Sequence, residues 1–169
     1  MLSPIGKVLM SRLDVPDTKF SLDGVYSITL EFSADTNSAF MSYLDYQMEQ
    51  AAAVAKVEHK LKKVKEASVP YALNLEDETF KAIFKMKASG TTKAGEGWSR
   101  KPEVFDADLN PIDPYIPVGS LVRVSYIPSQ FYVSLIGAGI SLRLQAVQVQ
   151  QLEDIHPVTA KYGFTALTT

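Results

Sequence analysis

The residues best suited to chemistry in this chain are cations gathered around its single tryptophan, Trp98. Between Lys81 and Lys101 they are accompanied by one acid, Glu96. The cations of this stretch are Lys81, Lys85, Lys87, Lys93, Arg100 and Lys101. Cations beside an exposed aromatic ring suit the phosphates and bases of a single-stranded nucleic acid. The alternative interpretation is an ordinary solvated hairpin.

The composition of the whole chain limits the other classes of function. Its 169 residues are 46% hydrophobic and 21% charged, with a net charge of −2 and no cysteine. The size suits one soluble domain with a real core. Lack of cysteine excludes disulfides, thiol catalysis and thiolate zinc sites. Pro4 and Gly6 interrupt the start, and no long apolar stretch is present, so we expect neither a signal peptide nor a membrane span.

Alternating apolar and polar residues predict most of the strands. The alternation is clear over Val25–Phe32, and again over Lys81–Ser89 with Ile83 as an exception. In Gly139–Gln151 it changes parity, which predicts a β-bulge near Ala146. Further strands are expected over 4–12, 103–107, 121–127 (ending before Pro128) and 131–135, with turns over 14–23.

One long helix is predicted between the second and third strands. Ser33 or Asp35 could cap it, and apolar residues then recur every three or four positions as far as about Glu66. Residues 67–79 are expected to be a connector. The fold class is therefore mainly β, a β-barrel with one long inserted α-helix, in a single domain over 1–152 followed by a tail over 153–169.

Two arginines and one tyrosine outside the first cluster extend the binding hypothesis. Arg123 and Arg143 each lie in mid-strand on the polar parity, and Tyr126 offers a ring for stacking. Each arginine could instead pair with a carboxylate on a neighbouring strand. A single aromatic residue in a small barrel belongs to the core more often than to a binding surface.

Catalytic and metal-binding motifs are weak throughout. Asp106–Asn110 begins like a calcium-binding loop, but prolines at 111 and 117 occupy the positions that need glycine and glutamate. His59 and His156 have no partner at ligand spacing, and no serine lies in a nucleophile motif. We therefore predict no catalytic residue, metal or cofactor. A metal-dependent nuclease built on Asp106, Asp108 and Asp113 is the enzymatic alternative.

Taken in order, several segments resemble the single-stranded DNA-binding proteins of tailed bacteriophages. They are SPIGKV, GVYSITLEF, GWSRKPEVFDADLNPI, GSLVRVSYIP and GAGISLRLQAVQVQQL, and they extend from about Ser3 to Leu152. The resemblance implies an OB-fold without enzymatic activity or cofactor, which coats single-stranded DNA during phage replication, recombination and repair. It also implies work in the cytoplasm of an infected bacterium, a second copy of the chain as partner, and contacts with the phage polymerase or helicase.

The resemblance also directs attention to particular residues. It places the nucleic acid on a barrel face lined by basic and aromatic side chains. The candidates by position are Lys85, Lys87, Trp98, Arg100, Lys101, Arg123, Tyr126 and Arg143. The family's acidic C-terminal tail is not matched, because the last acid is Asp154. The alternative function is a non-enzymatic protein-interaction module on the same scaffold.

Overall fold

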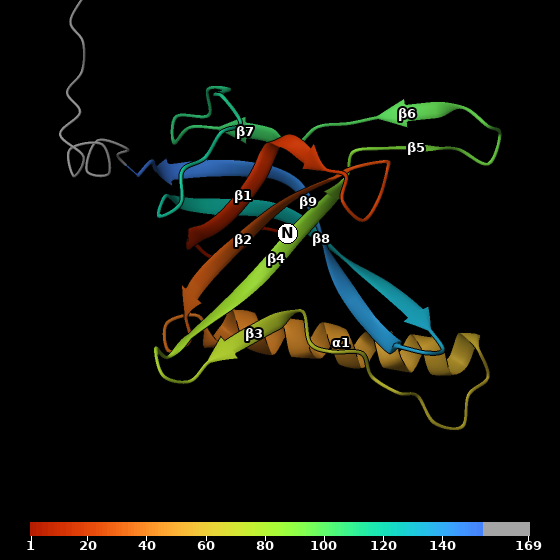
Figure 1. Cartoon of the computed structure of the whole chain (residues 1–169). Helices are drawn as coiled ribbons and strands as arrows, with labels where there is room; N and C mark the ends of the chain where they lie inside the picture. Colours follow the sequence, from red (N-terminus) through yellow and green to blue (C-terminus); the bar gives the residue numbers. More distant parts are fainter. Residues whose placement is uncertain (154–169) are drawn as a thin grey trace, which may run out of the picture.

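Strands predominate in the computed structural model, which describes residues 1–153 (Figure 1). The elements in chain order are β1 (Gly6–Asp17), β2 (Val25–Ser33), α1 (Ser38–Glu58), β3 (Tyr71–Asn74), β4 (Thr79–Lys87), β5 (Ser89–Thr91), β6 (Gly97–Ser99), β7 (Glu103–Phe105), β8 (Leu121–Val133) and β9 (Gly137–Gln151). The predicted fold class, mainly β with one long helix between strands, is confirmed. The predicted tail, apart from its first residue, lies outside the described residues.

Five strands close into a ring. Antiparallel pairing joins β4 to β2, β2 to β1, β1 to β8 and β8 to β9. A single parallel bridge between Lys85 and Arg143 then joins β4 back to β9. β3 extends the sheet beside the first half of β4, and β7 extends it beside β9. The five-strand ring with an inserted helix agrees with the OB-fold expected from the sequence.

The inside of the ring holds the apolar rows that the alternation predicted. Phe32 and Phe80 stack with ring centroids 5.1 Å apart, and Phe40 of α1 meets Phe32 edge to face at 5.3 Å. α1 runs along one end of the ring and buries Phe40, Leu44 and other apolar residues against it (Figure 1). Aromatic pairs of this geometry stabilise a core beyond the area they bury. The core therefore fixes the orientation of the strands that carry the outer face.

The helix ends earlier than predicted. Its last residue is Glu58, and Lys60 has a positive φ of 52°, which stops the helix. The predicted continuation to Glu66 was wrong. Leu61 and Val64 continue the apolar spacing of the helix in the sequence, but the backbone at these residues is not helical. The predicted cap at Ser33 or Asp35 was also wrong, since Asn37 occupies the N-cap position without a capping side-chain bond.

Two strands are longer than predicted. β1 continues to Asp17 through a segment expected to be a turn. β8 continues through Pro128, which pairs with Leu142, so the predicted end before Pro128 was wrong. The pairing of β8 with β1 reaches only Leu121 and Val122, so the missing N–H of Pro128 can face a free edge.

The change of parity in β9 has the predicted cause. Ser125 pairs with Ala146 and the next residue, Tyr126, pairs with Leu144, which leaves Gln145 as an extra residue. The bulge beside Ala146 is confirmed. It lets Leu142, Leu144, Val147 and Val149 all face the core despite their change of parity.

Candidate nucleic-acid interface

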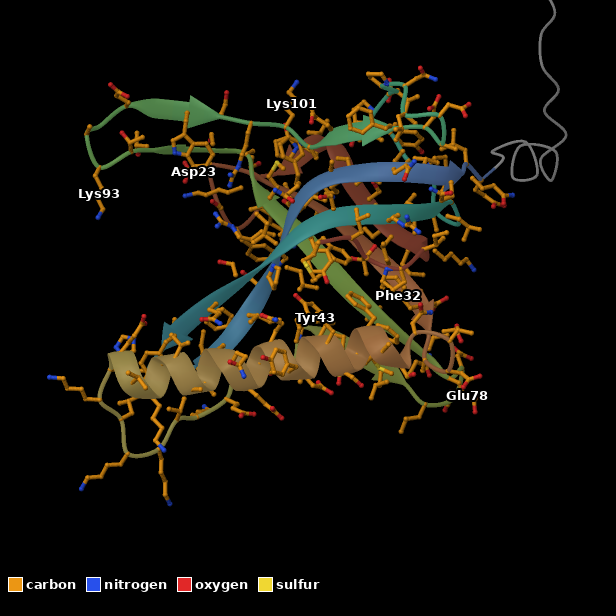
Figure 2. The ribbon with its side chains drawn as sticks, turned by 180° about the vertical axis from the view of Figure 1, so that it is seen from behind. Asp23, Phe32, Tyr43, Glu78, Lys93 and Lys101 are labelled. Carbon is orange, nitrogen blue, oxygen red and sulfur yellow. The ribbon has the colours of Figure 1, made fainter. Side chains whose placement is uncertain are left out.

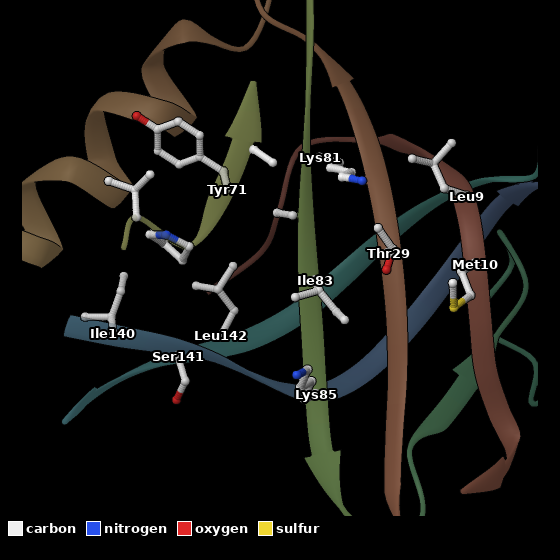
Figure 3. A pocket seen from close by; sticks show the side chains of 14 residues that line it. Leu9, Met10, Thr29, Tyr71, Lys81, Ile83, Lys85, Ile140, Ser141 and Leu142 are labelled. Carbon is white, nitrogen blue, oxygen red and sulfur yellow. The ribbon is translucent and has the colours of Figure 1, made fainter. Parts of the chain in front are cut away.

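A groove of about 560 Å³ lies on the outside of the ring, across β1, β2, β4 and β9 (Figure 3). Its floor is largely apolar, and lysines stand along it. Its lining includes Leu9, Met10, Thr29, Ala72, Lys81, Ile83, Lys85, Ile140 and Ser141. Three rows of paired side chains cross this face from strand to strand, two of them charged and one mainly apolar. The pairing register of the strands determines which residues lie in each row.

The first row carries cations on three of its four positions. Arg12 pairs with Ser27, Ser27 with Lys85, and Lys85 with Arg143. Directly paired residues project from the same face of a sheet, so these side chains form one line. Three inter-strand spacings of about 4.8 Å make the line roughly 14 Å long. We call it the cation row; no acid occupies any of its positions.

The next row along the strands is mainly apolar. Met10 pairs with Thr29, and Thr29 pairs with Ile83. Met10 is 57% exposed and Ile83 is 42% exposed, although both are large apolar side chains in the middle of a sheet. Ile83 thus breaks the alternation of β4 because it belongs to this outer surface. We call Met10, Thr29 and Ile83 the apolar stripe.

A third row lies beyond the apolar stripe and is less positive. Lys7 pairs with Glu31, Glu31 with Lys81, and Lys81 with Ala72 of β3. The carboxylate of Glu31 lies between the two lysines and lowers the positive potential there. The outer face is therefore asymmetric, with most of its positive charge on the cation row, whose Lys85 lines the groove.

The β5–β6 hairpin, which we call the arm, holds the tryptophan away from this groove (Figure 1). The guanidinium carbon of Arg100 lies 4.8 Å from the centroid of the Trp98 ring. Arg100 also donates from Nε to the carbonyl oxygen of Lys87 at 2.9 Å. The other side of the hairpin brings Gly90 directly opposite Trp98. Trp98 and Arg100 are thus packed on each other within the arm.

Lys87 and Lys101 lie at the base of the arm. The ammonium of Lys87 forms a 3.0 Å ion pair with Asp23, which partly neutralises it. Lys101 is exposed where the arm returns to the ring (Figure 2). The basic stretch 81–101 therefore contributes to two separate surfaces. Lys81 and Lys85 line the groove, and only Lys85 belongs to the cation row, whereas the later cations lie in the arm or at its base.

Tyr126 is not a surface platform. Its side chain is 1% exposed and packs edge to face on Phe84 at 5.3 Å and on Phe40 at 6.1 Å. Burial also raises the pKa of its hydroxyl well above the ordinary value. The prediction that Tyr126 binds nucleic acid was wrong, since its position in β8 faces the core.

Arg123 lies on a different part of the ring from Arg143. It pairs with Gln148, whereas Arg143 pairs with Lys85, and the two arginines do not share a row. The Nε atom of Arg123 is buried without a hydrogen-bond partner. Its prediction as a nucleic-acid contact stays untested.

Sequence interpretation missed Arg12, Met10 and Ile83 as surface residues of the site. Arg12 belongs to a strand that carried no charge anomaly, and its neighbours in the row come from β2, β4 and β9. One signal was present, the apolar Ile83 on the polar parity of β4.

The acidic loop after β7 is organised by its own hydrogen bonds. Asp106 Oδ1 accepts from the backbone N–H groups of Asn110 at 2.8 Å and Asp108 at 2.9 Å. These bonds, chiefly the one from Asn110, lower the pKa of the Asp106 carboxyl. Residues 1–153 contain no cluster of three potential metal ligands, and none of their helices is long and apolar enough to cross a membrane.

No protein-family model matches the chain, and neither does any curated protein. The chain is similar in structure to gp2.5, a single-stranded DNA-binding protein encoded by bacteriophage T7, with a TM-score of 0.80 and 23% identity over 91% of this chain and 92% of that one. It is also similar to the single-stranded DNA-binding protein of bacteriophage Enc34 in complex with ssDNA, with a TM-score of 0.65 and 18% identity over 90% and 86% of the two chains. The resemblance indicated by the sequence motifs is thus confirmed in the fold.

Proposed function

We propose that this chain binds single-stranded DNA along the groove, with phosphates on the cation row and bases on the apolar stripe. The observation that carries the proposal is the register that places Arg12, Lys85 and Arg143 in one line beside Met10 and Ile83. Cations attract the phosphates, and an exposed apolar surface accepts the faces of unstacked bases. The asymmetry of charge places the sugar–phosphate chain on one side of the stripe.

The groove favours single strands over duplexes. The apolar stripe can contact a base only when the face of that base is free, and in a duplex these faces are stacked. Met10, Thr29 and Ile83 offer one hydroxyl among them for hydrogen bonding to base edges. Binding is therefore expected to be independent of sequence, because every base has an apolar face.

The wider role that we propose is inferred from the two phage proteins of similar structure. Both are phage proteins described as binding single-stranded DNA. We infer that the chain coats and protects single strands during phage DNA replication, recombination and repair, in the cytoplasm of the infected host. A phage polymerase or helicase, and a second copy of the chain, are the partners expected from the resemblance. We assign no catalytic role.

Equilibrium binding to labelled oligo-dT and to a duplex of equal length tests the proposal. With three phosphate contacts, the logarithm of the affinity for the single strand should fall with the logarithm of salt concentration with a slope of about −2. The affinity for the single strand should exceed that for the duplex at least about tenfold, or about 1.4 kcal/mol. Equal affinities, or binding that salt does not weaken, would contradict the proposal.

Failure to bind any single strand at low salt would favour the protein-interaction module instead. A comparison of dT with rU oligomers in the same titration shows whether the 2′-hydroxyl matters.

A further inference from the structure

Two exposed apolar surfaces lie at opposite ends of α1, and their surroundings carry opposite charge. The helix has 21 residues, and at 1.5 Å per residue it separates its ends by roughly 31 Å. The turn between β8 and β9 lies near the C-terminal end of the helix, and the turn between β3 and β4 lies near its N-terminal end (Figure 1).

The surface at the C-terminal end of α1 is apolar with a basic border. Leu135 is 82% exposed at the turn between β8 and β9, beside Val133 at 45% and Ile136 at 52%. The segment after the helix supplies four lysines, at positions 60, 62, 63 and 65, against Glu58 and Glu66 at its two ends. We call this surface the basic tip (Figure 2).

The basic tip is a defined structure because the two segments are bonded together. Lys65 donates from Nζ to the carbonyl oxygen of Leu135 at 3.2 Å and accepts at its own carbonyl from Ala138 N–H at 2.8 Å. A Cβ at Gly137 would lie 2.4 Å from the Lys65 carbonyl oxygen, so the close approach requires glycine there. The His59 and Tyr132 rings, 4.5 Å apart, join the helix end to the hairpin.

The surface at the N-terminal end of α1 is apolar with an acidic border. Leu75 is 84% exposed and Leu73 is 54% exposed. Exposed acids surround the two leucines: Asp35, Glu76, Asp77 and Glu78. The turn is fixed by Asn74, whose Oδ1 accepts from Glu76 N–H and whose Nδ2 donates to Asp77. We call this surface the acidic end.

The acidic end is also hollowed. Leu73, Leu75 and Glu78 line a hollow of about 560 Å³ beside Ala34 and Asp35. A second hollow, of about 660 Å³, continues from Leu75 and Glu76 to Leu9, Ala72 and Lys81. The last three residues also line the nucleic-acid groove, so the acidic end opens directly into it.

We propose that the basic tip of one molecule docks on the acidic end of a second copy, so that copies associate head to tail along single-stranded DNA. The exposed leucines at the two hollows offer an apolar contact to Leu135 and Ile136 of the tip, and four lysines meet four acids. The second hollow meets the groove at Leu9, Ala72 and Lys81, and Ile140 and Ser141, which also line the groove, belong to the strand that leads from the tip. Both surfaces therefore lie beside the groove, and docking brings the grooves of successive molecules next to each other.

The two surfaces are different, so the contact is heterologous, and a docked pair keeps one free surface of each kind. Such a contact adds further copies instead of closing a two-fold dimer, and along a DNA strand it extends as an open chain. The inference rests on the proposed function, because the DNA supplies the common axis. It extends that function, since contact between neighbours makes binding to long strands cooperative.

Charge reversal at each end tests the contact. One variant carries Lys62→Glu and Lys63→Glu at the basic tip, and the other carries Glu76→Lys and Glu78→Lys at the acidic end. Within residues 1–153 these four side chains are exposed and make no hydrogen bond or ion pair, so both variants should fold. A matched control reverses Lys19 and Lys93, which lie on loops far from α1.

Affinity is measured for a short oligo-dT that holds one molecule and for a long oligo-dT that holds several. The parent protein and the control should bind the long strand at least about tenfold more tightly per site. Each end variant should lose this advantage while it keeps its affinity for the short strand. An equimolar mixture of the two end variants should regain it, because each reversed surface then meets an opposite charge.

The outcomes separate this inference from the proposed function. If the parent binds neither oligomer, the function itself fails. If the parent binds the short strand and gains nothing on the long one, only the head-to-tail contact fails. If the tip variant loses affinity for the short strand and the mixture restores nothing, the basic tip is a DNA contact and the proposed docking is wrong.

Discussion

The cation row and the arm contain the same kinds of residue but use them differently. In the arm, Arg100 is packed on Trp98 and donates to the backbone of Lys87, while Lys87 pairs with Asp23. In the cation row, neither Arg12, Lys85 nor Arg143 takes part in an ion pair with a described residue. Two cations at the arm therefore have partners within the fold, whereas the three cations of the row have no ion pair among the described residues.

The density of charge in a sequence therefore does not measure how many of the charged side chains are free to bind a ligand. The arm and its base bring Lys87, Arg100 and Lys101 together with the tryptophan within a short stretch, so this stretch dominated the sequence interpretation. The cation row takes one residue from each of three strands that are distant in the chain. Strand register, not sequence clustering, builds the more available positive surface.

Matched triple variants give the largest test of this comparison. Replacement of Arg12, Lys85 and Arg143 by alanine should weaken binding to oligo-dT about 100-fold, or about 2.8 kcal/mol. The salt slope should become about 2 units shallower, because three phosphate contacts are lost. Fluorescence anisotropy over a range of salt concentrations measures both quantities.

The control replaces Lys87, Arg100 and Lys101 at the base of the arm by alanine. It removes the same number of charges, and we expect less than about a threefold loss because two of these side chains already have partners. A larger loss from the arm triple than from the row triple would overturn the comparison. Circular dichroism of both variants verifies that each remains folded.

Much of the fold could be predicted from the order of apolar and polar residues within single segments of the chain. The alternation of Val25–Phe32 identified β2 almost to its ends, and the parity change in β9 located the bulge at Gln145. These features depend on residues that are close in sequence. The long helix was overextended because apolar spacing continued past Glu58, where Lys60 takes a left-handed conformation that spacing cannot reveal.

The site was less predictable for a physical reason. Lys85 and Arg143 were correctly placed on the outer parity of their strands, but their adjacency arises from one parallel bridge between β4 and β9. Tyr126 lies on the inner parity of β8, yet the chemistry of its ring alone suggested a platform. Parity within a strand can be read locally, whereas the partner across a sheet cannot.

A substitution on the apolar stripe should have a smaller effect on DNA binding than the triple variant of the cation row. Ile83→Ser should weaken oligo-dT binding about fivefold, about 1 kcal/mol, because an apolar contact with a base is lost. The salt slope should not change, since no phosphate contact is removed. Isothermal titration at two salt concentrations separates the two effects.

Phe20 provides the apolar control on the side of the arm. It is 89% exposed in the loop between β1 and β2, the loop whose Asp23 pairs with Lys87. Phe20→Ser should change the affinity less than twofold. A greater loss from Phe20→Ser than from Ile83→Ser would move the base contacts from the stripe to this loop.

The smallest effect on DNA binding is expected from disruption of the arm itself. A Cβ at Gly90 would lie 2.6 Å from Cζ2 of Trp98, so Gly90→Ala must displace the indole from its place opposite Gly90. The emission of Trp98 should shift to longer wavelength as its ring becomes more exposed, while the affinity for oligo-dT stays within twofold. Gly97→Ala is the matched control, because a Cβ there meets nothing within 4 Å and the emission should not change. A Gly90→Ala protein that lost its affinity along with the packing of Trp98 would show that the ordered arm, and not the cation row alone, holds the DNA.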